Sequence, residues 1–393
     1  MNEKIVITGI ARTPMGGFQG VLSDATASQL GATAIAAAVS RSQLPADLID
    51  EVIMGCVLPA GQGQAPARQA SLGAGLSLAT GCTTINKMCG SGMKATMLAN
   101  DLLRAGTNQI MVAGGIESMT NSPYLLPKAR AGFRMGHGQV VDHMFLDGLE
   151  DAYDKGKLMG SFAEATADLY GFTRESQDDF AIRSLKRARR AIESGGFKDE
   201  ITAVTLKSRK GEVIVDTDEQ PFNANLDKIP TLRAAFRQDG TVTAANSSSI
   251  SDGAAALVLM TGSQAEEHGI DPIVEIKGHS THAHEPAWFT TAPVGAIQKL
   301  LQKIEWSVED VDLFEINEAF AVVTMAAIKE LNLDPEKVNV NGGACALGHP
   351  IGASGARILV TLISALKKRG LKRGIAALCI GGGEATALAV ELI

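Results

Sequence analysis

The sequence predicts an α/β fold in which helices cover largely parallel sheets, and three observations lead to that prediction. Short apolar runs rich in β-branched residues recur along the chain next to glycines, as is typical of buried strands. Longer stretches with apolar residues at helical spacing separate these runs, and this alternation is typical of parallel sheets. The run 109-QIMVAGGIES-118 also resembles 375-IAALCIGGGEA-385, since each is an apolar strand followed by a glycine cluster and an acid. This likeness predicts an internal duplication.

The first part of the chain contains three expected strands and two expected helices. We expect buried strands at 4–10, 51–57 and 109–118, because their apolar runs are short and contain β-branched residues. Helices are expected at 26–42 and 92–106, where apolar residues recur at helical spacing.

The middle of the chain, at about 119–245, has a different character and predicts an inserted layer that faces the substrate. A helix is expected at 174–195, with acids early and bases late, which suits the helix dipole. The buried pattern returns at 252–261, as a strand or a helix, so the chain is expected to rejoin the first half there.

The last third repeats the pattern of the first. We expect a helix at 318–332, a strand at 337–343, a helix that opens near Gly352 and runs through 356–370, and a strand at 374–393.

A chain of 393 residues is too long for one ordinary core, so two or three domains or one large duplicated domain are expected.

Bulk composition narrows the class of protein. The net charge is −7 and no Lys/Arg-rich stripe stands out, so nucleic acid is not expected as a partner. No apolar run is long enough to span a bilayer, and the N-terminus gives no targeting signal. Five cysteines, without CxxC pairs or zinc-type spacing, predict reduced thiols. A cytoplasmic protein without a membrane partner is therefore expected.

Cys89 is the candidate nucleophile. It lies in 86-NKMCGSGMKA-95, just before a Gly-Ser-Gly turn and the expected start of a helix. The free N–H groups and partial positive charge of a helix N-terminus stabilise a thiolate, and small neighbours would let a bulky thioester reach the sulfur. The same pattern fits a small buried cysteine packed against glycines. This segment alone does not decide between catalysis and packing.

His349 is the candidate base. It lies in 341-NGGACALGHPIGASGAR-357, where Pro350 disfavours a helical conformation at the histidine. The imidazole is therefore expected on a loop just before a helix. A lone histidine is more often a surface or core residue, but the crowding of glycines around this one favours a functional role.

Cys379 and Asn317 are further candidates. Cys379 is expected to end a buried strand and enter the triple-Gly turn of 379-CIGGGEA-385, whose N–H groups can point at an oxyanion. Asn317 begins 317-NEAFA-321, where an ordinary helix N-cap is the simpler interpretation.

Together these segments closely resemble the thiolase family. NKxCGSGxKA, NEAFA, NGGAxALGHPIGASGAR and CIGGG occur in the family's order and spacing, with 11-ARTPMGGFQG-20 and 113-AGGIESMTNSPY-124. The resemblance covers essentially the whole chain, and several blocks in fixed order are a stronger signal than any single motif. It implies two duplicated β-α-β-α-β-α-β-β halves in a layered α/β/α/β/α arrangement, with an inserted loop domain.

The boundaries that we expect follow from this arrangement. The parts are an N-terminal half with Cys89 (1–118 and 246–270), a CoA-binding loop domain (119–245), and a C-terminal half (271–393) that carries Asn317, His349 and Cys379.

The resemblance also implies a role for each site residue. Cys89 would carry the acyl group as a thioester, His349 would activate it, and Cys379 would move a proton to and from the α-carbon. Asn317 resembles the residue that holds a water in a first oxyanion hole, where His349 is the other donor. The backbone N–H groups of Cys89 and Gly381 resemble a second hole, which serves the acyl-enzyme.

Coenzyme A is implied as substrate and product, and no metal or redox cofactor is implied. Ser248 is expected to hydrogen-bond the pantetheine, and Phe320 to line the acyl pocket. The positions that match the family's CoA site are Leu149, Met159, Lys228, Ala244, Ser248, Phe289, Ala319 and Phe320.

Three residues depart from the family pattern. Leu158 stands where many biosynthetic relatives have His, which puts one CoA contact in question. Lys228 stands where some relatives have Ser, and its ammonium could approach the CoA phosphates or face solvent. Glu384 stands where many relatives have Met, and the sequence offers no physical account of it.

Three functions are compatible with these patterns. The first is a short-chain thiolase of the acetyl-CoA acetyltransferase type, which we favour because the loop 134-RMGHG-138 and the segment 285-EPAWFTTAP-293 resemble that branch. The second is a degradative 3-ketoacyl-CoA thiolase with a broader range of chain lengths. The third is a non-catalytic acyl-CoA or lipid-binding relative, which would be expected to lack Cys89, His349 or Cys379. By analogy, a homo-oligomer is expected, a dimer of dimers joined by the 120–145 loop.

Overall fold

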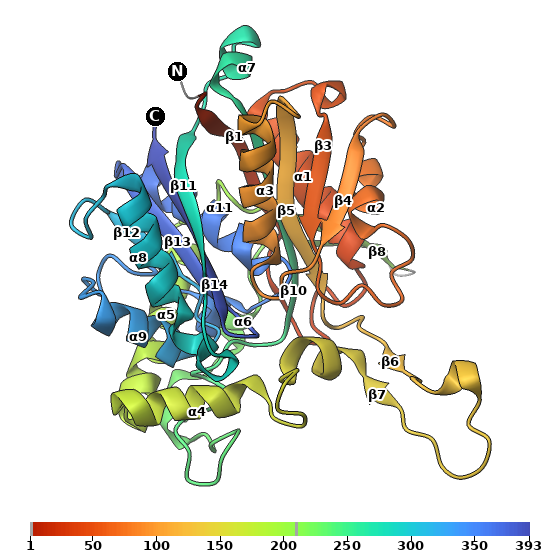
Figure 1. The fold of residues 1–393 in the computed structure, drawn as a ribbon, viewed down its shortest axis with the longest axis vertical. Coiled ribbons are helices and arrows are strands. Elements are labelled where there is room, and N and C mark those ends of the chain that lie inside the picture. Colours follow the sequence, from red (N-terminus) through yellow and green to blue (C-terminus); the bar gives the residue numbers. More distant parts are fainter. Residues whose placement is uncertain (1–2, 209–210) are drawn as a thin grey trace.

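A continuous mixed sheet joins two similar halves of the chain in the computed structural model, which describes residues 3–208 and 211–393 (Figure 1). Its strand order is β12-β13-β14-β11-β1-β10-β5-β3-β4, with the short β2 (Gly16–Gly17) paired to β10. The halves meet where β1 (Ile5–Arg12) pairs antiparallel with β11 (Val274–Ala283). Because β1 and β11 begin the two halves, the sheet has equivalent strands on either side of this junction.

In the first half, β3 pairs in parallel with β4 and β5, while β5–β10 and β10–β1 are antiparallel. The predicted strands and helices are all present, and 252–261 is a strand. The further elements of this half are α1 (Ala27–Ser42), β3 (Glu51–Gly55), α2 (Pro66–Gly73), β4 (Gly81–Ile85), α3 (Ser91–Arg104), β5 (Ile110–Ser118) and β10 (Ser251–Thr261).

The second half repeats the pairing pattern: β12–β13 is parallel, and β13–β14 and β14–β11 are antiparallel. The strand expected at 374–393 is in fact two strands, because the triple-Gly turn reverses the chain between β13 and β14. The remaining elements of this half are η5 (Pro286–Thr291), α8 (Ala292–Ile304), β12 (Leu313–Ile316), α9 (Ala321–Glu330), α10 (Ala344–Leu347), α11 (Ser354–Arg369), β13 (Arg373–Ile380) and β14 (Glu384–Leu392).

The prediction of a strand at 337–343 was wrong. Val338 makes only an isolated parallel bridge to Phe314, at the place that β4 occupies in the first half. The next residue, Asn339, has a φ of 48°, and its side-chain amide bonds both the N–H and the C=O of Ile316 at 2.8 Å. This side chain replaces the backbone pairing that a strand would make, so the chain leaves the sheet.

The helices complete a layered α/β/α/β/α arrangement, as expected. Helices α3 and α11 lie in the middle layer, where their apolar residues share one core with inward-facing residues of both halves of the sheet. Helix α1 packs on the outer face of the first half, and α8 on the outer face of the second (Figure 1).

The two middle helices approach closely because glycines face each other at their first turns. A Cβ on Gly92 would lie 2.8 Å from the backbone N of Ala356, and one on Gly355 would overlap the backbone N of Met93. Real Cβ atoms do not approach backbone this closely, so the helices can cross here only without those side chains. The crossing brings the residues that precede α3 next to those that precede α11.

The region between β5 and β10 forms the inserted layer. The β6–β7 arm projects from the main body, and α4 and α5 lie beneath the sheet (Figure 1). The named elements here are β6 (Tyr124–Leu125), η2 (Ala129–Ala131), β7 (Val141–Asp142), a π-helical turn (Phe145–Leu149), α4 (Met159–Tyr170), α5 (Arg174–Glu193), β8 (Val204–Ser208), β9 (Gly211–Val215), α6 (Gln220–Asn223) and η4 (Leu226–Thr231).

A buried ion cluster ties this layer to both halves. The guanidinium of Arg12 contacts Glu200 at 2.6 Å and Asp218 at 2.7 Å, and all three side chains are fully buried. Thr361 on α11 donates to Glu200 at 3.0 Å. Burial alone would lower the pKa of Arg12, but the two carboxylates raise it above its usual value, so the guanidinium remains charged.

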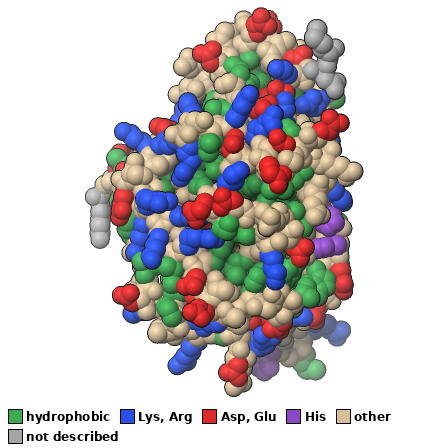
Figure 2. Space-filling view, turned by 90° about the vertical axis from the view of Figure 1, so that its left-hand side faces the viewer, with side chains coloured by type: hydrophobic (Ala, Val, Ile, Leu, Met, Phe, Trp, Pro, Cys, Tyr) green, Lys and Arg blue, Asp and Glu red, His purple; other side chains and the backbone are tan. Residues whose placement is uncertain are grey.

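Charged side chains of both signs are interspersed on the face that carries the second half (Figure 2). Among the described helices, none is both long and apolar enough to cross a membrane.

We predict that Gly355→Ala lowers the free energy of unfolding by about 2–3 kcal/mol, because an overpacked core must shift backbone atoms. The loss should appear although alanine is favoured over glycine by about 1 kcal/mol inside a helix. Urea unfolding followed by circular dichroism measures it. Gly262→Ala, at the start of α7 (Gly262–Glu267), is the matched control, because its Cβ would meet other atoms only at 3.6 Å or more. Equal stability of the two variants would contradict the role of the crossing.

Candidate active site

Cys89 lies in a tight turn immediately before α3. Met88 has a φ of 46°, which a residue with a side chain rarely adopts, and its N–H donates to Asn86 Oδ1 at 2.9 Å. The Ser91 hydroxyl accepts from the Lys87 N–H at 2.8 Å and donates to the Met88 carbonyl at 2.7 Å. These bonds fix the backbone on both sides of Cys89, so its sulfur has a defined position.

The surroundings of Cys89, which is partly buried, favour the thiol over the thiolate. Burial raises its pKa to about 11, while hydrogen bonds from the backbone N–H groups of Gly381 and of Cys89 itself act in the opposite direction. Two backbone donors from separate parts of the chain thus converge on one sulfur. This is the geometry that a developing oxyanion beside that sulfur requires.

His349 occupies the loop before α11, as its Pro350 neighbour predicted. The Ser354 hydroxyl lies 2.5 Å from Nδ1 and donates to the Pro350 carbonyl at 2.9 Å. Because the Ser354 hydroxyl donates its proton to that carbonyl, its oxygen can only accept a hydrogen bond from His349 Nδ1–H. The lone pair of the neutral imidazole is therefore on Nε2. Nε2 is buried, without a hydrogen-bond partner among the residues that the structure describes.

The imidazole of His349 is neutral. Burial lowers its pKa to about 3, and the nearby charge of Arg357 acts in the same direction. Asn317, which is fully buried, lies against the ring with Nδ2 3.4 Å from Nδ1, and its Oδ1 accepts from Arg357 Nη2 at 3.4 Å. The buried Nε2 lone pair is available to accept a proton, although the lowered pKa makes the ring a weak base at rest.

Cys379 is completely buried near the end of β13, one residue before the turn. Burial raises its pKa well above the usual value for a thiol, and the proximity of Cys89 raises it further. The turn that follows places Gly382 and Gly383 at φ values of 94° and 86°, which are open to glycine. The electrostatic effect of Cys89 on Cys379 shows that the two thiols are neighbours, and the Gly381 N–H at the start of this turn bonds the Cys89 sulfur.

An apolar wall surrounds the second sulfur. Met159, Phe289, Ala319 and Phe320 belong to one hydrophobic cluster with Cys379. Met159 Sδ lies 3.7 Å from where a Cβ on Gly381 would be. Leu149 packs in a second cluster that includes Cys89. The structure thus brings these predicted substrate contacts together around the two sulfurs.

The other predicted CoA contacts lie on the inserted layer and its return to the sheet. The Ser248 N–H donates to Ala319 O at 2.9 Å, which places Ser248 beside the apolar wall. Ala244 and Lys228 are both exposed. The exposure of Lys228 is compatible with an approach of its ammonium to the CoA phosphates and with a position that only faces solvent. A contact with CoA stays a prediction.

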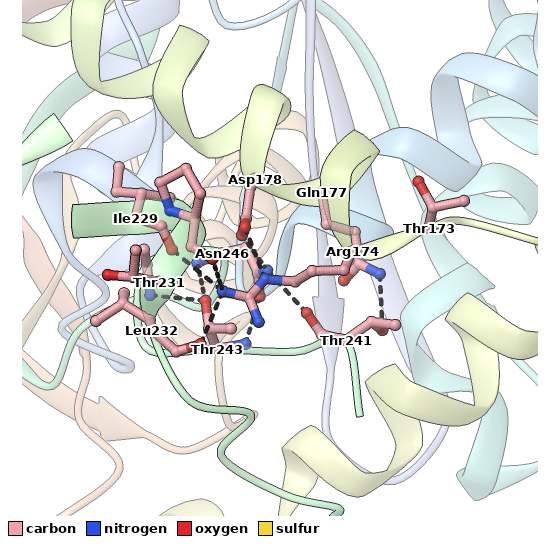
Figure 3. Close-up of polar contacts among 12 residues, drawn as sticks. Thr173, Arg174, Gln177, Asp178, Ile229, Thr231, Leu232, Thr241, Thr243 and Asn246 are labelled. Carbon is pink, nitrogen blue, oxygen red and sulfur yellow. Dashed lines mark hydrogen bonds and ion pairs between the residues drawn. The ribbon is translucent and has the colours of Figure 1, made fainter. Parts of the chain in front are cut away.

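A polar network holds this returning segment in place (Figure 3). Arg174 contacts Asp178 at 2.6 Å and donates to the carbonyls of Ile229 and Leu232 in or beside η4. Asn246 donates to Asp178 at 3.0 Å, and so links the same carboxylate to the segment that carries Ser248. The network connects α5, η4 and the residues before β10.

Sequence reasoning missed two groups that support the site. Ser354 orients His349, and a serine in a Gly-rich segment gave no distinct signal. Glu117 lies buried at the end of β5, where its carboxylate accepts from the N–H groups of Val57, Leu58 and Gly352. Burial raises the pKa of Glu117 to about 7, although the three hydrogen bonds act to lower it. The sequence signal that could have pointed to Glu117 was its position as the acid after the glycine cluster in 109–118, which matches the acid after the cluster in 375–385.

Within residues 3–208 and 211–393, no group of three or more His, Cys, Asp or Glu side chains could hold a metal ion.

Comparison with known proteins agrees with this architecture. Two family descriptions match: "Thiolase, N-terminal domain" over residues 5–263 and "Thiolase, C-terminal domain" over residues 270–392. Acetyl-CoA acetyltransferase 2 of Arabidopsis thaliana is 51% identical over 99% of this chain and 97% of its own. The acetyl-CoA acetyltransferase of Cupriavidus necator is 49% identical over 98% of this chain and 99% of its own. The crystal structure of the Bacillus anthracis acetyl-CoA acetyltransferase superposes with a TM-score of 0.97, at 44% identity over 100% of both chains.

We predict that alkylation of Cys89 by iodoacetamide accelerates about ten-fold per pH unit between about pH 6 and pH 9. The thiolate is the reactive form, and a thiol with a pKa of about 11 gains thiolate steadily over that range. Mass spectrometry of the peptide that contains Cys89 measures the rate, with Cys89→Ser to identify the signal. A plateau near neutral pH would mean that Cys89 is already a thiolate, paired with a charged His349.

Proposed function

The chain belongs to the thiolase family, and from that premise we propose that it condenses two acetyl-CoA molecules to acetoacetyl-CoA and CoA in a reversible Claisen reaction. The observation that carries this proposal is a pair of neighbouring thiols with two backbone N–H groups beside an apolar wall. A neutral imidazole lies on the loop before α11, the helix that crosses α3. The names of the similar proteins from Arabidopsis thaliana and Cupriavidus necator support acetyl-CoA as the substrate.

In the first half-reaction, Cys89 attacks the thioester carbonyl of acetyl-CoA while its proton passes to His349 Nε2. The oxyanion of the tetrahedral intermediate would be held by the N–H groups of Cys89 and Gly381, and each such donor contributes about 3–4 kcal/mol in comparable sites. The carbon–sulfur bond to CoA then breaks. The CoA thiolate takes the proton of Cys379 and leaves as the thiol, so the products are acetyl-Cys89, an imidazolium and a Cys379 thiolate.

In the second half-reaction, the Cys379 thiolate removes a proton from the α-carbon of a second acetyl-CoA. The enolate oxygen would be held by His349 Nε2–H and by a water on Asn317. The enolate carbon attacks the acetyl carbonyl, the bond to Cys89 breaks, and His349 returns its proton to that sulfur. A raised thiol pKa makes the Cys379 thiolate a stronger base, which suits a weakly acidic carbon.

CoA would reach this centre along the wall formed by the inserted layer. We propose that Ser248 hydrogen-bonds the pantetheine and that Leu149, Met159, Phe289, Ala319 and Phe320 enclose its thioester end. Ala244 and Lys228 would lie farther out, toward the nucleotide. The reaction would need no metal or redox cofactor, because a thiol nucleophile, a thiolate base and hydrogen-bond donors suffice for thioester condensation.

We further propose that the protein acts in fatty acid metabolism in the cytoplasm, without a nucleic acid or membrane partner. The five free cysteines support a reducing compartment.

A homotetramer, a dimer of dimers, is the assembly that we propose. Strand β4 ends the sheet and its residues are partly or fully exposed, so it offers an open edge to a second copy. The projecting β6–β7 arm exposes large apolar side chains that a further pair of subunits could cover; these are Tyr124, Leu126, Phe133, Met135 and Val140. The mass in solution, measured by light scattering, decides between tetramer, dimer and monomer.

We predict that thiolysis is fastest with acetoacetyl-CoA and declines as the 3-ketoacyl chain lengthens. Each methylene that a pocket does not accommodate costs about 1–3 kcal/mol. Steady-state kcat/KM for a series of 3-ketoacyl-CoA substrates measures the preference, and Cys89→Ser should abolish turnover of every member. A preference for chains of about eight or more carbons would overturn the short-chain assignment. Full activity of Cys89→Ser would overturn the thiolase mechanism itself.

We predict that Cys379→Ser abolishes exchange of the acetyl protons of acetyl-CoA with solvent, because a serine hydroxyl is too weak a base for that carbon. Acylation of Cys89 should slow but persist, because CoA can leave as a thiolate and take its proton from solvent in place of Cys379. Deuterium uptake into acetyl-CoA, followed by NMR, measures exchange, and the intact mass of the protein measures acylation. Normal deuterium uptake in this variant would show that another group moves the proton.

A further inference from the structure

We propose that Lys87 and Glu384 form an ion pair that positions the Gly381 N–H against the Cys89 sulfur. Lys87 Nζ contacts Glu384 Oε2, and the two side chains are only partly exposed. Lys87 lies two residues before Cys89, and Glu384 lies three residues after Gly381. Both are positioning residues that act through the backbone, and their importance for catalysis rests on the function proposed above.

The turn that carries Gly381 is closed by the pairing of Ile380 with Glu384, and Gly383 packs closely on the backbone of 284–286. Its first two glycines have fewer contacts. Gly381, Gly382 and Gly383 have no side chains, and no described atom lies within 4 Å of where a Cβ on Gly382 would be. The far end of the turn is tied to the sheet by the His284 N–H, which donates to the Gly383 carbonyl at 2.9 Å. A glycine run has the largest conformational freedom of any sequence, so a fixed donor within it needs an external restraint.

Lys87, by contrast, extends from a rigid backbone. Its N–H donates to Ser91 Oγ at 2.8 Å, and its carbonyl accepts from the Gly90 N–H at 3.0 Å. These are the bonds that fix the Cys89 turn to α3. The ion pair therefore connects the well-held turn of the first half to the glycine turn of the second, on either side of the sulfur.

The size of the interaction suits this role better than a role in stability. A partly exposed ion pair contributes about 0–1 kcal/mol to folding, which is small for a chain of this length. A donor that shifts away from a developing oxyanion costs much more in rate, because removal of one such donor slows turnover by about 100- to 1,000-fold. If Gly381 is held less firmly, turnover is expected to slow by a part of that factor.

The principal alternative is a purely electrostatic effect, and it predicts opposite signs. If charge alone mattered, loss of Glu384 would leave a cation near Cys89 and lower its pKa, whereas loss of Lys87 would leave an anion and raise it. If the pair positions Gly381, either loss weakens the N–H contact, so both variants raise the Cys89 pKa and slow acyl transfer.

The experiment compares Lys87→Met, Glu384→Gln and the exchanged double variant Lys87→Glu/Glu384→Lys in the full-length protein. Each single variant should lower the kcat of acetoacetyl-CoA thiolysis by roughly 5- to 20-fold, with KM changed by less than about two-fold. Both should also slow alkylation of Cys89 at fixed pH, a readout that does not depend on turnover. The exchanged pair should recover most of both losses.

The matched control is Lys277→Met, which removes an ammonium of similar exposure from ion pairs with Glu275 and Glu391, elsewhere on the sheet. It should leave kcat and alkylation unchanged. Opposite effects of the two single variants, effects no larger than those of the control, or an exchanged pair no better than the single variants would each overturn the proposal. Failure of the proposed function would appear separately, as an inactive wild-type protein or an active Cys89→Ser.

Discussion

The contact on which the rest of the structure depends is the crossing of α3 and α11 at Gly92 and Gly355. The two helices come from different halves of the chain, yet backbone meets backbone between them. Each helix is preceded by a loop that carries a candidate catalytic residue, Cys89 on one and His349 on the other. Because the crossing lies at the first turns of both helices, it fixes the distance between these groups more firmly than contacts farther along could.

Burial of the site has a definite electrostatic result. It disfavours every charged form, so the Cys89 and Cys379 thiols keep their protons and His349 stays neutral. Backbone N–H groups, which carry partial charge at no cost of ionisation, are the donors that remain available beside the sulfurs. Such a site is uncharged at rest and is ready to stabilise charge only as it develops in a reaction.

The inserted layer is more than a cover, because its anchors pass through the core. Glu200 lies in this layer and contacts both Arg12 on β1 and Thr361 on α11, all three buried. Removal of one partner from such a buried cluster leaves an uncompensated charge. The layer therefore cannot move as a free lid without disturbing both halves. Met159, which this layer contributes to the apolar wall, is accordingly held in register with the sulfurs.

The sequence by itself determined the class of fold and the duplication, since alternating patterns and Gly-rich turns are local features of a chain. It also supplied Cys89, His349 and Cys379 as candidates, whose roles follow from the resemblance to a family and stay predictions. It could not determine pairing: 337–343 resembles a strand, but the side chain of Asn339 takes the bonds that a neighbouring strand would need. Nor could it find Ser354, which orients His349, or the partner of Glu384, because Lys87 lies 297 residues away. Only the tertiary structure decided those contacts, since they depend on how close two distant backbones come. That closeness is set by packing around the crossing helices, which no local pattern encodes.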